Sequence, residues 1–103
     1  MSTVTDIILT MGCHDLDVAK VNALLEPTVG ENQLLYQVAK PAGSPGKVIQ
    51  ADIYIGAFNH LDLGEVVVCL QGLPLNDYER ESVRLFVQEE HDEHGFHEVR
   101  IWP

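Results

Sequence analysis

The sequence predicts an α+β fold of the ferredoxin-like type, βαββαβ with an extra C-terminal strand, in which two helices cover one face of a mainly antiparallel sheet. Two observations predict it. Segments with strand alternation and segments with helical spacing follow one another in the order strand, helix, strand, strand, helix, strand, strand. The chain has 103 residues, of which 46% are hydrophobic, enough for one core. We therefore expect a single domain over residues 1–103.

The first strand and the first helix follow from periodicity and capping signals. Residues 3–11 alternate between two faces and predict a strand with one solvated side. Residues 16–26 place apolar side chains at helical spacing. Asp15 or Asp17 is the expected N-cap of this helix, and Pro27 is expected to end it, because the residue before a proline disfavours helical backbone angles.

The next two strands are expected to form a long antiparallel hairpin. Residues 34–39 and 48–58 both have strand composition, and the segment 41–46 between them contains two prolines and two glycines. Along 48–58, Ile53, Ile55 and Ala57 share one face, whereas Asp52, Tyr54 and Phe58 share the other.

The second half of the chain is predicted as a helix followed by two strands. Residues 66–70 favour a strand by propensity alone. We predict a helix there, because Asp62 and Glu65 have the spacing of a capping box and Gly72 follows the run. Polar residues 75–81 are a connection with at most one helical turn. The alternating segments 83–88 and 96–102 are the last two strands.

Cys13 and His14 follow the first strand, and Asn59 and His60 follow the third. If these two strands are parallel central neighbours, all four residues meet beside two helix N-termini, which favour anions and lower thiol pKa values. Cys13 and His60 could then act as nucleophile and base, or bind an anionic ligand.

A metal site is a further interpretation of this cluster, since thiolate, imidazole and carboxylate all bind zinc. Asp15 or Asp62 would supply the carboxylate. In the simpler interpretation, which we favour, the aspartates cap helices and the histidines are half-exposed at loop ends.

The segment from His91 to His97 has histidines at every third position, His94 between them, among several carboxylates. Such a tract is one signature of metal binding. Gly95 and the flanking strands instead favour a solvated acidic hairpin turn, with His94 and Gly95 at its tip.

A sheet with helices on one face leaves its other face open. We expect Tyr54, Phe58 and Phe86 on that open face, where they would form an apolar patch of the kind that marks an interface. Homodimerisation through this face is the most economical outcome. Burial of the same rings in the core explains the pattern equally well.

The net charge of the chain limits the classes of molecule that it is expected to bind. Six basic and sixteen acidic residues give a formal net charge of −10 at pH 7, which disfavours nucleic acid and anionic membranes. A basic protein is the partner that this charge would attract. High solubility is the simpler explanation of the same charge.

Two cysteines without CxxC spacing predict free thiols in a cytoplasmic protein. The first residues do not resemble a signal peptide, and the longest apolar run, 66–70, is far too short to span a bilayer. We expect a protein that is neither exported nor embedded in a membrane.

No nucleotide-binding, metallopeptidase or hydrolase motif occurs in the sequence, and we expect no cofactor. The sequence therefore favours a non-catalytic interaction or regulatory protein that acts as a homodimer or as a binder of a basic protein. The alternative is a small-molecule-binding or enzymatic domain with its site near Cys13 and His60.

Overall fold

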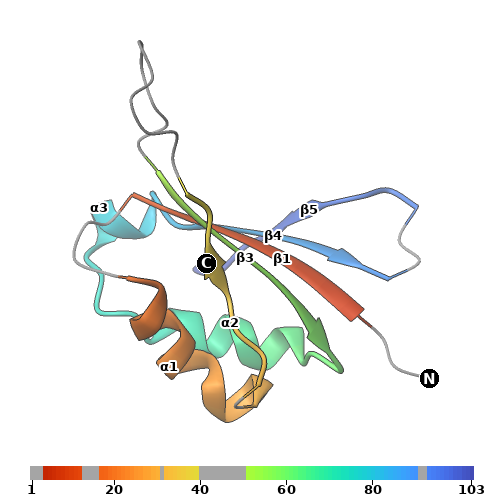
Figure 1. The fold of residues 1–103 in the computed structure, drawn as a ribbon. Helices are drawn as coiled ribbons and strands as arrows, with labels where there is room; N and C mark the ends of the chain where they lie inside the picture. The colour runs from red at the N-terminus through yellow and green to blue at the C-terminus, as the bar shows by residue number, and fades with distance from the viewer. Residues whose placement is uncertain (1–3, 13–16, 31, 40–50, 91–92) are drawn as a thin grey trace.

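The computed structural model describes residues 4–12, 17–30, 32–39, 51–90 and 93–103. These residues form a small α+β fold built on a five-strand antiparallel open sheet in the order β2-β3-β1-β4-β5 (Figure 1). The described strands are β1 (Val4–Met11), β2 (Tyr36–Gln37), β3 (Asp52–Asn59), β4 (Arg84–Glu89) and β5 (His97–Val99). The described helices are α1 (Val18–Val29), α2 (Leu63–Gln71) and α3 (Asp77–Arg80).

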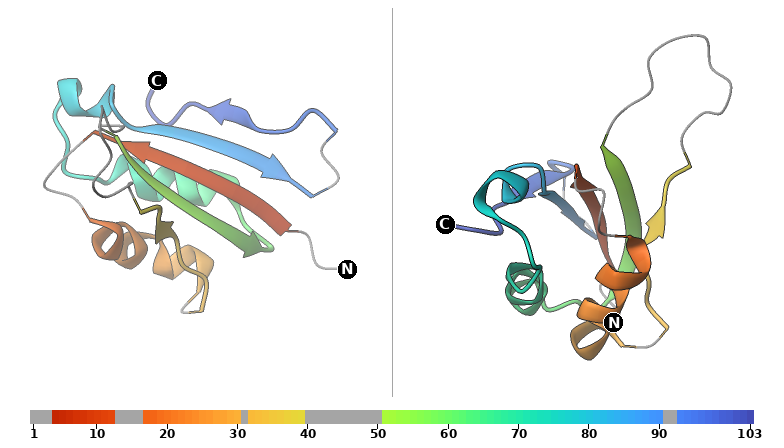
Figure 2. Two further views of the ribbon diagram at one scale, coloured as in Figure 1. Left: turned by 45° about the horizontal axis from the view of Figure 1, so that its top comes forward. Right: turned by 90° about the vertical axis from the view of Figure 1, so that its left-hand side faces the viewer.

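The helices α1 and α2 pack against each other and lie on one face of the sheet, as the sequence predicts (Figure 2). The short helix α3 joins α2 to β4 beyond one end of this layer. The opposite face of the sheet carries no helix among the described residues. The described residues thus form two layers, a helical layer and a sheet that none of the described helices covers on its other side.

The helix α1 begins at its predicted N-cap but does not end at Pro27. The carboxylate of Asp17 accepts a hydrogen bond from the backbone N–H of Lys20 at 2.9 Å. Pro27 lies inside the last turn, and the helix continues to Val29. The expected end at Pro27 was therefore wrong. A proline this close to the C-terminal end of the helix removes only one backbone hydrogen-bond donor. Continuing the helix past it buries Val29 in the core, which outweighs this loss.

The segment 66–70 is helical, which confirms the prediction made from the cap. The carboxylate of Asp62 accepts from the backbone N–H of Glu65 at 3.2 Å, at the start of α2. Val66 and Leu70, four residues apart, are buried on one side of α2. Capping and burial together outweigh the strand propensity of the valines.

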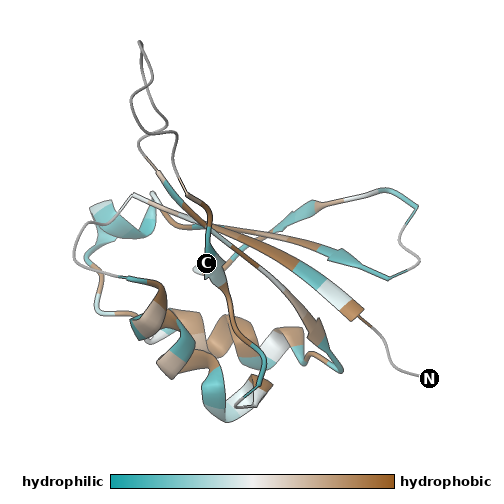
Figure 3. Ribbon diagram, in the orientation of Figure 1, coloured by the Kyte–Doolittle hydropathy of each residue, from teal (hydrophilic) through white to brown (hydrophobic). Residues whose placement is uncertain are grey.

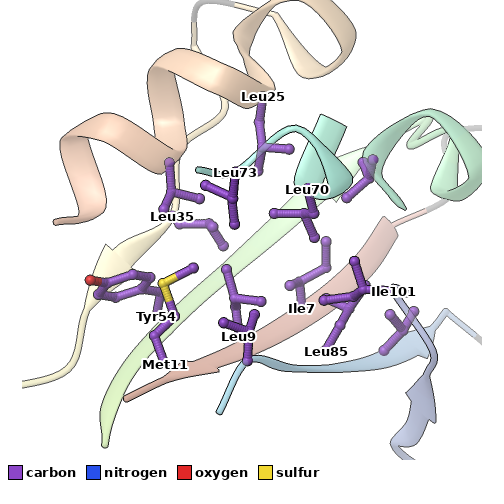
Figure 4. Close-up of a cluster of buried hydrophobic side chains, with 14 of the residues drawn as sticks. Ile7, Leu9, Met11, Leu25, Leu35, Tyr54, Leu70, Leu73, Leu85 and Ile101 are labelled. Atoms are coloured by element: carbon purple, nitrogen blue, oxygen red, sulfur yellow. The ribbon is translucent and has the colours of Figure 1, made fainter. Parts of the chain in front are cut away.

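One face of the sheet supplies most of the core, and Figure 3 shows apolar residues along the strands and on the helices that cover them. On β1 the predicted alternation is confirmed: Thr5, Ile7, Leu9 and Met11 are buried on the same side. Figure 4 shows how Ile7, Leu9 and Met11 of this strand meet side chains of the helices and of the segment after β5. The labelled members of this cluster are Ile7, Leu9, Met11, Leu25, Leu35, Tyr54, Leu70, Leu73, Leu85 and Ile101.

Tyr54 and Phe58 belong to this core, so their prediction as open-face residues was wrong. Their relative exposures are 0% and 1%. Gly56 lies between them on the same side of β3, and a Cβ there would come within 2.9 Å of the Phe58 ring and 3.0 Å of the carbonyl oxygen of Leu34. The missing side chain lets the ring and Leu35 pack closely over the strand.

The edge strands are shorter than expected. The strand β2 has two residues, extended by one hydrogen bond from the N–H of Val38 to the carbonyl of Ile53 at 2.8 Å. The strand β5 has three residues. The antiparallel pairing of β2 with β3 confirms the predicted hairpin, whose loop 41–46 lies outside the described residues.

Candidate interaction surface on the open sheet face

The face of the sheet that the helices leave uncovered carries a row of apolar side chains across neighbouring strands. We call this side the open face. In the strand register, Ile8 of β1 lies between Ile55 of β3 and Phe86 of β4. Tyr36 of β2 pairs with Ile55, and Glu98 of β5 pairs with Phe86. One row therefore crosses all five strands, and only its last member is charged.

Several of these side chains are exposed to a degree unusual for their size. Tyr36 is 64% exposed, Ile55 43% and Phe96, which precedes β5, 44%. Large apolar side chains that gather on a surface and stay accessible often mark an interaction site.

A shallow groove of about 530 Å³ runs over β1 and β3 on this face. Its apolar lining includes Ile8, Tyr36, Ile55 and Phe96, and Asp6 contributes a carboxylate. The groove is open, so it resembles a depression in an interface more than an enclosed ligand cavity.

Charged residues are sparse within the strands of the open face. They are Asp6 in the groove and the ion pair of Arg84 with Glu98, whose N–O distance is 2.9 Å. Both members of the pair are about half exposed, so the pair adds little to stability. The open face is accordingly a weakly charged surface on a strongly acidic chain.

The sequence predicted such a patch but named only one of its members. Phe86 lies on the open face and is half-buried. Tyr54 and Phe58 face the helices, as described above. Ile8 and Ile55 were missed as members of the patch, although the alternation of Ile53, Ile55 and Ala57 already separated Ile55 from the aromatic side.

The expected neighbourhood of Cys13, His14, Asn59 and His60 rested on a parallel pairing, and this premise was wrong. The strands β1 and β3 are antiparallel: Met11 pairs with Asp52, whereas Asn59 pairs with Val4. The C-terminal ends of the two strands thus lie about 23 Å apart along the pair. Asn59 and His60 are exposed, and Cys13 and His14 lie outside the described residues.

The histidine-rich hairpin is present, but its connection is longer than a two-residue turn. The strand β4 ends at Glu89 and β5 begins at His97, which pairs with Val87. His94 and His97 are exposed, and His91 lies outside the described residues. The described part of the chain contains no group of three or more residues arranged to hold a metal ion. A metal role for the three histidines stays a prediction.

Cys69 lies on α2 as a free, half-buried thiol.

No helix in the described ranges has the length and apolar character needed to cross a membrane.

Fold and surface together define a small α+β domain with a largely apolar sheet face that no helix of the described ranges covers. Comparison of the chain with models of protein families, with curated proteins and with solved structures found no match.

Proposed function

We propose that this chain is a non-catalytic interaction protein that pairs with a second copy of itself through the open face. The observation that supports this most directly is the apolar row through Ile8, Ile55 and Phe86, beside an open groove of about 530 Å³. Covering this face would remove exposed aliphatic and aromatic surface from water, the main favourable term in association.

The distribution of charge favours a second copy as the occupant. Two chains with a net charge of −10 repel each other, so they associate best through a surface with few acidic residues. The open face offers such a surface, with Asp6 and Glu98 as the acidic residues of its strands. A basic partner would be attracted more strongly by other, more acidic parts of the chain.

The lengths of the edge strands favour pairing through the face over pairing through an edge. The edge strands β2 and β5 have two and three residues, too few for a long intermolecular ladder. A twofold pairing of two open faces needs no free edge and closes on itself.

We also propose that the fold is of the ferredoxin-like type. Its support is the succession of elements and the position of both long helices on one face. The five-strand order, with β5 beside β4 and the helix α3 before β4, differs from a plain four-strand arrangement. We propose a cytoplasmic location, because the two cysteines lack the spacing and number typical of disulfide-bonded secreted domains.

The dimer is tested by replacing Ile55 with glutamate. We expect the wild-type chain to sediment as a dimer at micromolar concentration. The Ile55→Glu variant should be monomeric, because it brings a buried charge to the interface and raises the dissociation constant by about 100-fold or more. Analytical ultracentrifugation over a range of concentrations measures both.

The matched control is Val68→Glu. Val68 is 60% exposed on α2, in the helical layer, so this variant adds the same charge to an exposed aliphatic position away from the open face. It should keep the wild-type mass. A wild-type chain that is monomeric throughout, or two variants that dissociate equally, would contradict the proposal.

The change in association strength with salt concentration distinguishes binding to a second copy from binding to a basic partner. Between about 20 mM and about 300 mM sodium chloride, screening of the mutual repulsion should tighten the dimer several-fold. Attraction to a basic protein would weaken over the same range. Sedimentation equilibrium at the two salt concentrations gives the sign, and a dimer that loosens as salt rises would count against assembly through a weakly charged face.

A further inference from the structure

A second hollow, of about 390 Å³, lies where α3, the start of β4 and the chain segment after β5 meet. Its lining includes Arg80, Arg84 and Arg100. These are half of the six basic residues of an otherwise acidic chain. Such a gathering of guanidinium groups is typical of sites that bind carboxylate or phosphate groups.

Trp102 forms one wall of this hollow, with Arg80 stacked on it. The guanidinium carbon of Arg80 lies 5.5 Å from the centre of the indole ring, within the range of a cation–π contact. The segment that carries Trp102 is anchored to α2, because the side-chain amide of Gln71 donates to the carbonyl of Ile101 at 2.8 Å. The indole is therefore held in place.

Arg80 is positioned by a short but well-capped helix. The side chain of Asn76 accepts from the N–H of Glu79 at 2.8 Å, and the carboxylate of Glu79 accepts from the N–H of Asn76 at 3.2 Å. This capping box fixes α3, whose last residue is Arg80. Both walls of the hollow are thus held in place by hydrogen bonds.

Two buried donors of residues that line this hollow lack an acceptor. Among the described residues, neither the Nε of Arg80 nor the Nε1 of Trp102 has a hydrogen-bond partner. Buried donors are almost always paired in folded proteins, since an unpaired one is destabilising. A group with acceptor oxygens at the edge of this stacked pair would satisfy both after a shift of the two side chains that exposes these nitrogens.

Of the two arginines of this hollow with an ion pair described here, Arg80 has the weaker one. Arg84 is held by Glu98 at 2.9 Å, whereas Arg80 lies 3.6 Å from a carboxylate oxygen of Asp77. The Asp77 side chain is fully exposed, so this contact is weak.

We propose that this hollow binds the carboxylate group of a small monoanionic ligand, with Arg80 and Trp102 as its donors. The carboxylates of Asp77, Glu81 and Glu98 also line the hollow and offset the arginines, which disfavours a more highly charged phosphate. Arg80 donates to one carboxylate oxygen, and the indole N–H donates to the ligand from the adjacent wall. This inference does not depend on dimerisation through the open face.

Trp102 makes the test direct, because it is the only tryptophan of the chain. Its fluorescence and its single indole N–H signal in a ¹⁵N–¹H spectrum report on this hollow. The full chain is titrated with sodium acetate, with sodium phosphate and with sodium chloride at matched ionic strength. We expect acetate to shift the indole signal in a saturable way, and chloride to leave it unchanged.

Two substitutions at Arg80 separate hydrogen bonding from charge. Arg80→Gln should weaken acetate binding by about tenfold or more, through the loss of a charged donor. Arg80→Lys keeps the charge but lacks the Nε donor, and should also bind more weakly. The control Lys20→Gln removes the same charge from α1, away from the hollow, and should bind like the wild type.

Each remaining outcome contradicts the proposal. An indole shift that is equal for all three salts reports ionic strength only. Saturable binding of phosphate without binding of acetate identifies a different ligand class. Equal acetate affinity in the wild type and in Arg80→Gln removes Arg80 from the site.

Discussion

Replacing Phe58 with alanine should lower the free energy of unfolding by about 3–5 kcal/mol, the usual cost of removing a fully buried aromatic ring. The ring is 1% exposed and packs over Gly56 on the helical side of β3. The cavity left behind cannot collapse easily, because β3 pairs with β1 along its whole length, with Phe58 opposite Thr5. Urea denaturation followed by far-UV circular dichroism measures the change.

The control for Phe58 is Phe96→Ala. Phe96 is 44% exposed, so its removal should cost about 1 kcal/mol or less. Both substitutions are made in the Ile55→Glu background, so that any loss of a dimer does not contribute to the measured stability. Equal effects for the two rings would show that Phe58 is not a core residue.

The alternation of residues along β3 predicts which side chains share a face of the strand, but it does not predict which face is buried. The two-residue period correctly divided β3 into one side with Tyr54 and Phe58 and another with Ile53 and Ile55. Both sides are apolar, so the pattern did not reveal which of them faces the helices. Neighbouring strands decide it, since Tyr54 lies in register with Leu9 of β1, on the side where the helices pack.

The direction of β3 could have been predicted from elements already identified. A helix that connects two strands of one sheet on one face normally makes those strands parallel, as β1 and β2 are here. A hairpin then makes β3 antiparallel to β2, and so to β1 as well. The C-terminal ends of β1 and β3 then lie at opposite edges of the sheet, so Cys13 and His60, which follow these ends, are not expected to form a cluster.

The helix α2 illustrates the opposite case, in which a local signal was sufficient. Asp62, Glu65 and Gly72 mark its two ends, and the structure shows a helix from Leu63 to Gln71. The hollow around Arg80 and Trp102 was not predictable in this way. Its walls come from segments that the fold alone brings together, and no spacing in the sequence relates them.

The second large effect is expected from replacing Asn22. Its side chain makes hydrogen bonds to the segment before β2 of the kind that a neighbouring strand would otherwise make. Its side-chain oxygen accepts from the N–H of Leu35 at 2.8 Å, and its amide nitrogen donates to the carbonyl of Leu35 at 3.0 Å. Leu35 is 2% exposed and packs in the core. One side chain of α1 therefore satisfies both backbone groups of a buried residue.

Asn22→Ala should lower the free energy of unfolding by about 2–3 kcal/mol, since it leaves two backbone groups of Leu35 without partners. The better helix propensity of alanine offsets only about 0.6 kcal/mol of this loss. The measurement is urea denaturation in the Ile55→Glu background, together with hydrogen exchange at the amide of Leu35, which should lose its protection.

The matched control is Asn32→Ala at an exposed position, for which a change within about 0.5 kcal/mol is expected. If both substitutions have equally small effects, then packing of the Leu35 side chain, and not the paired hydrogen bonds, holds β2 against α1.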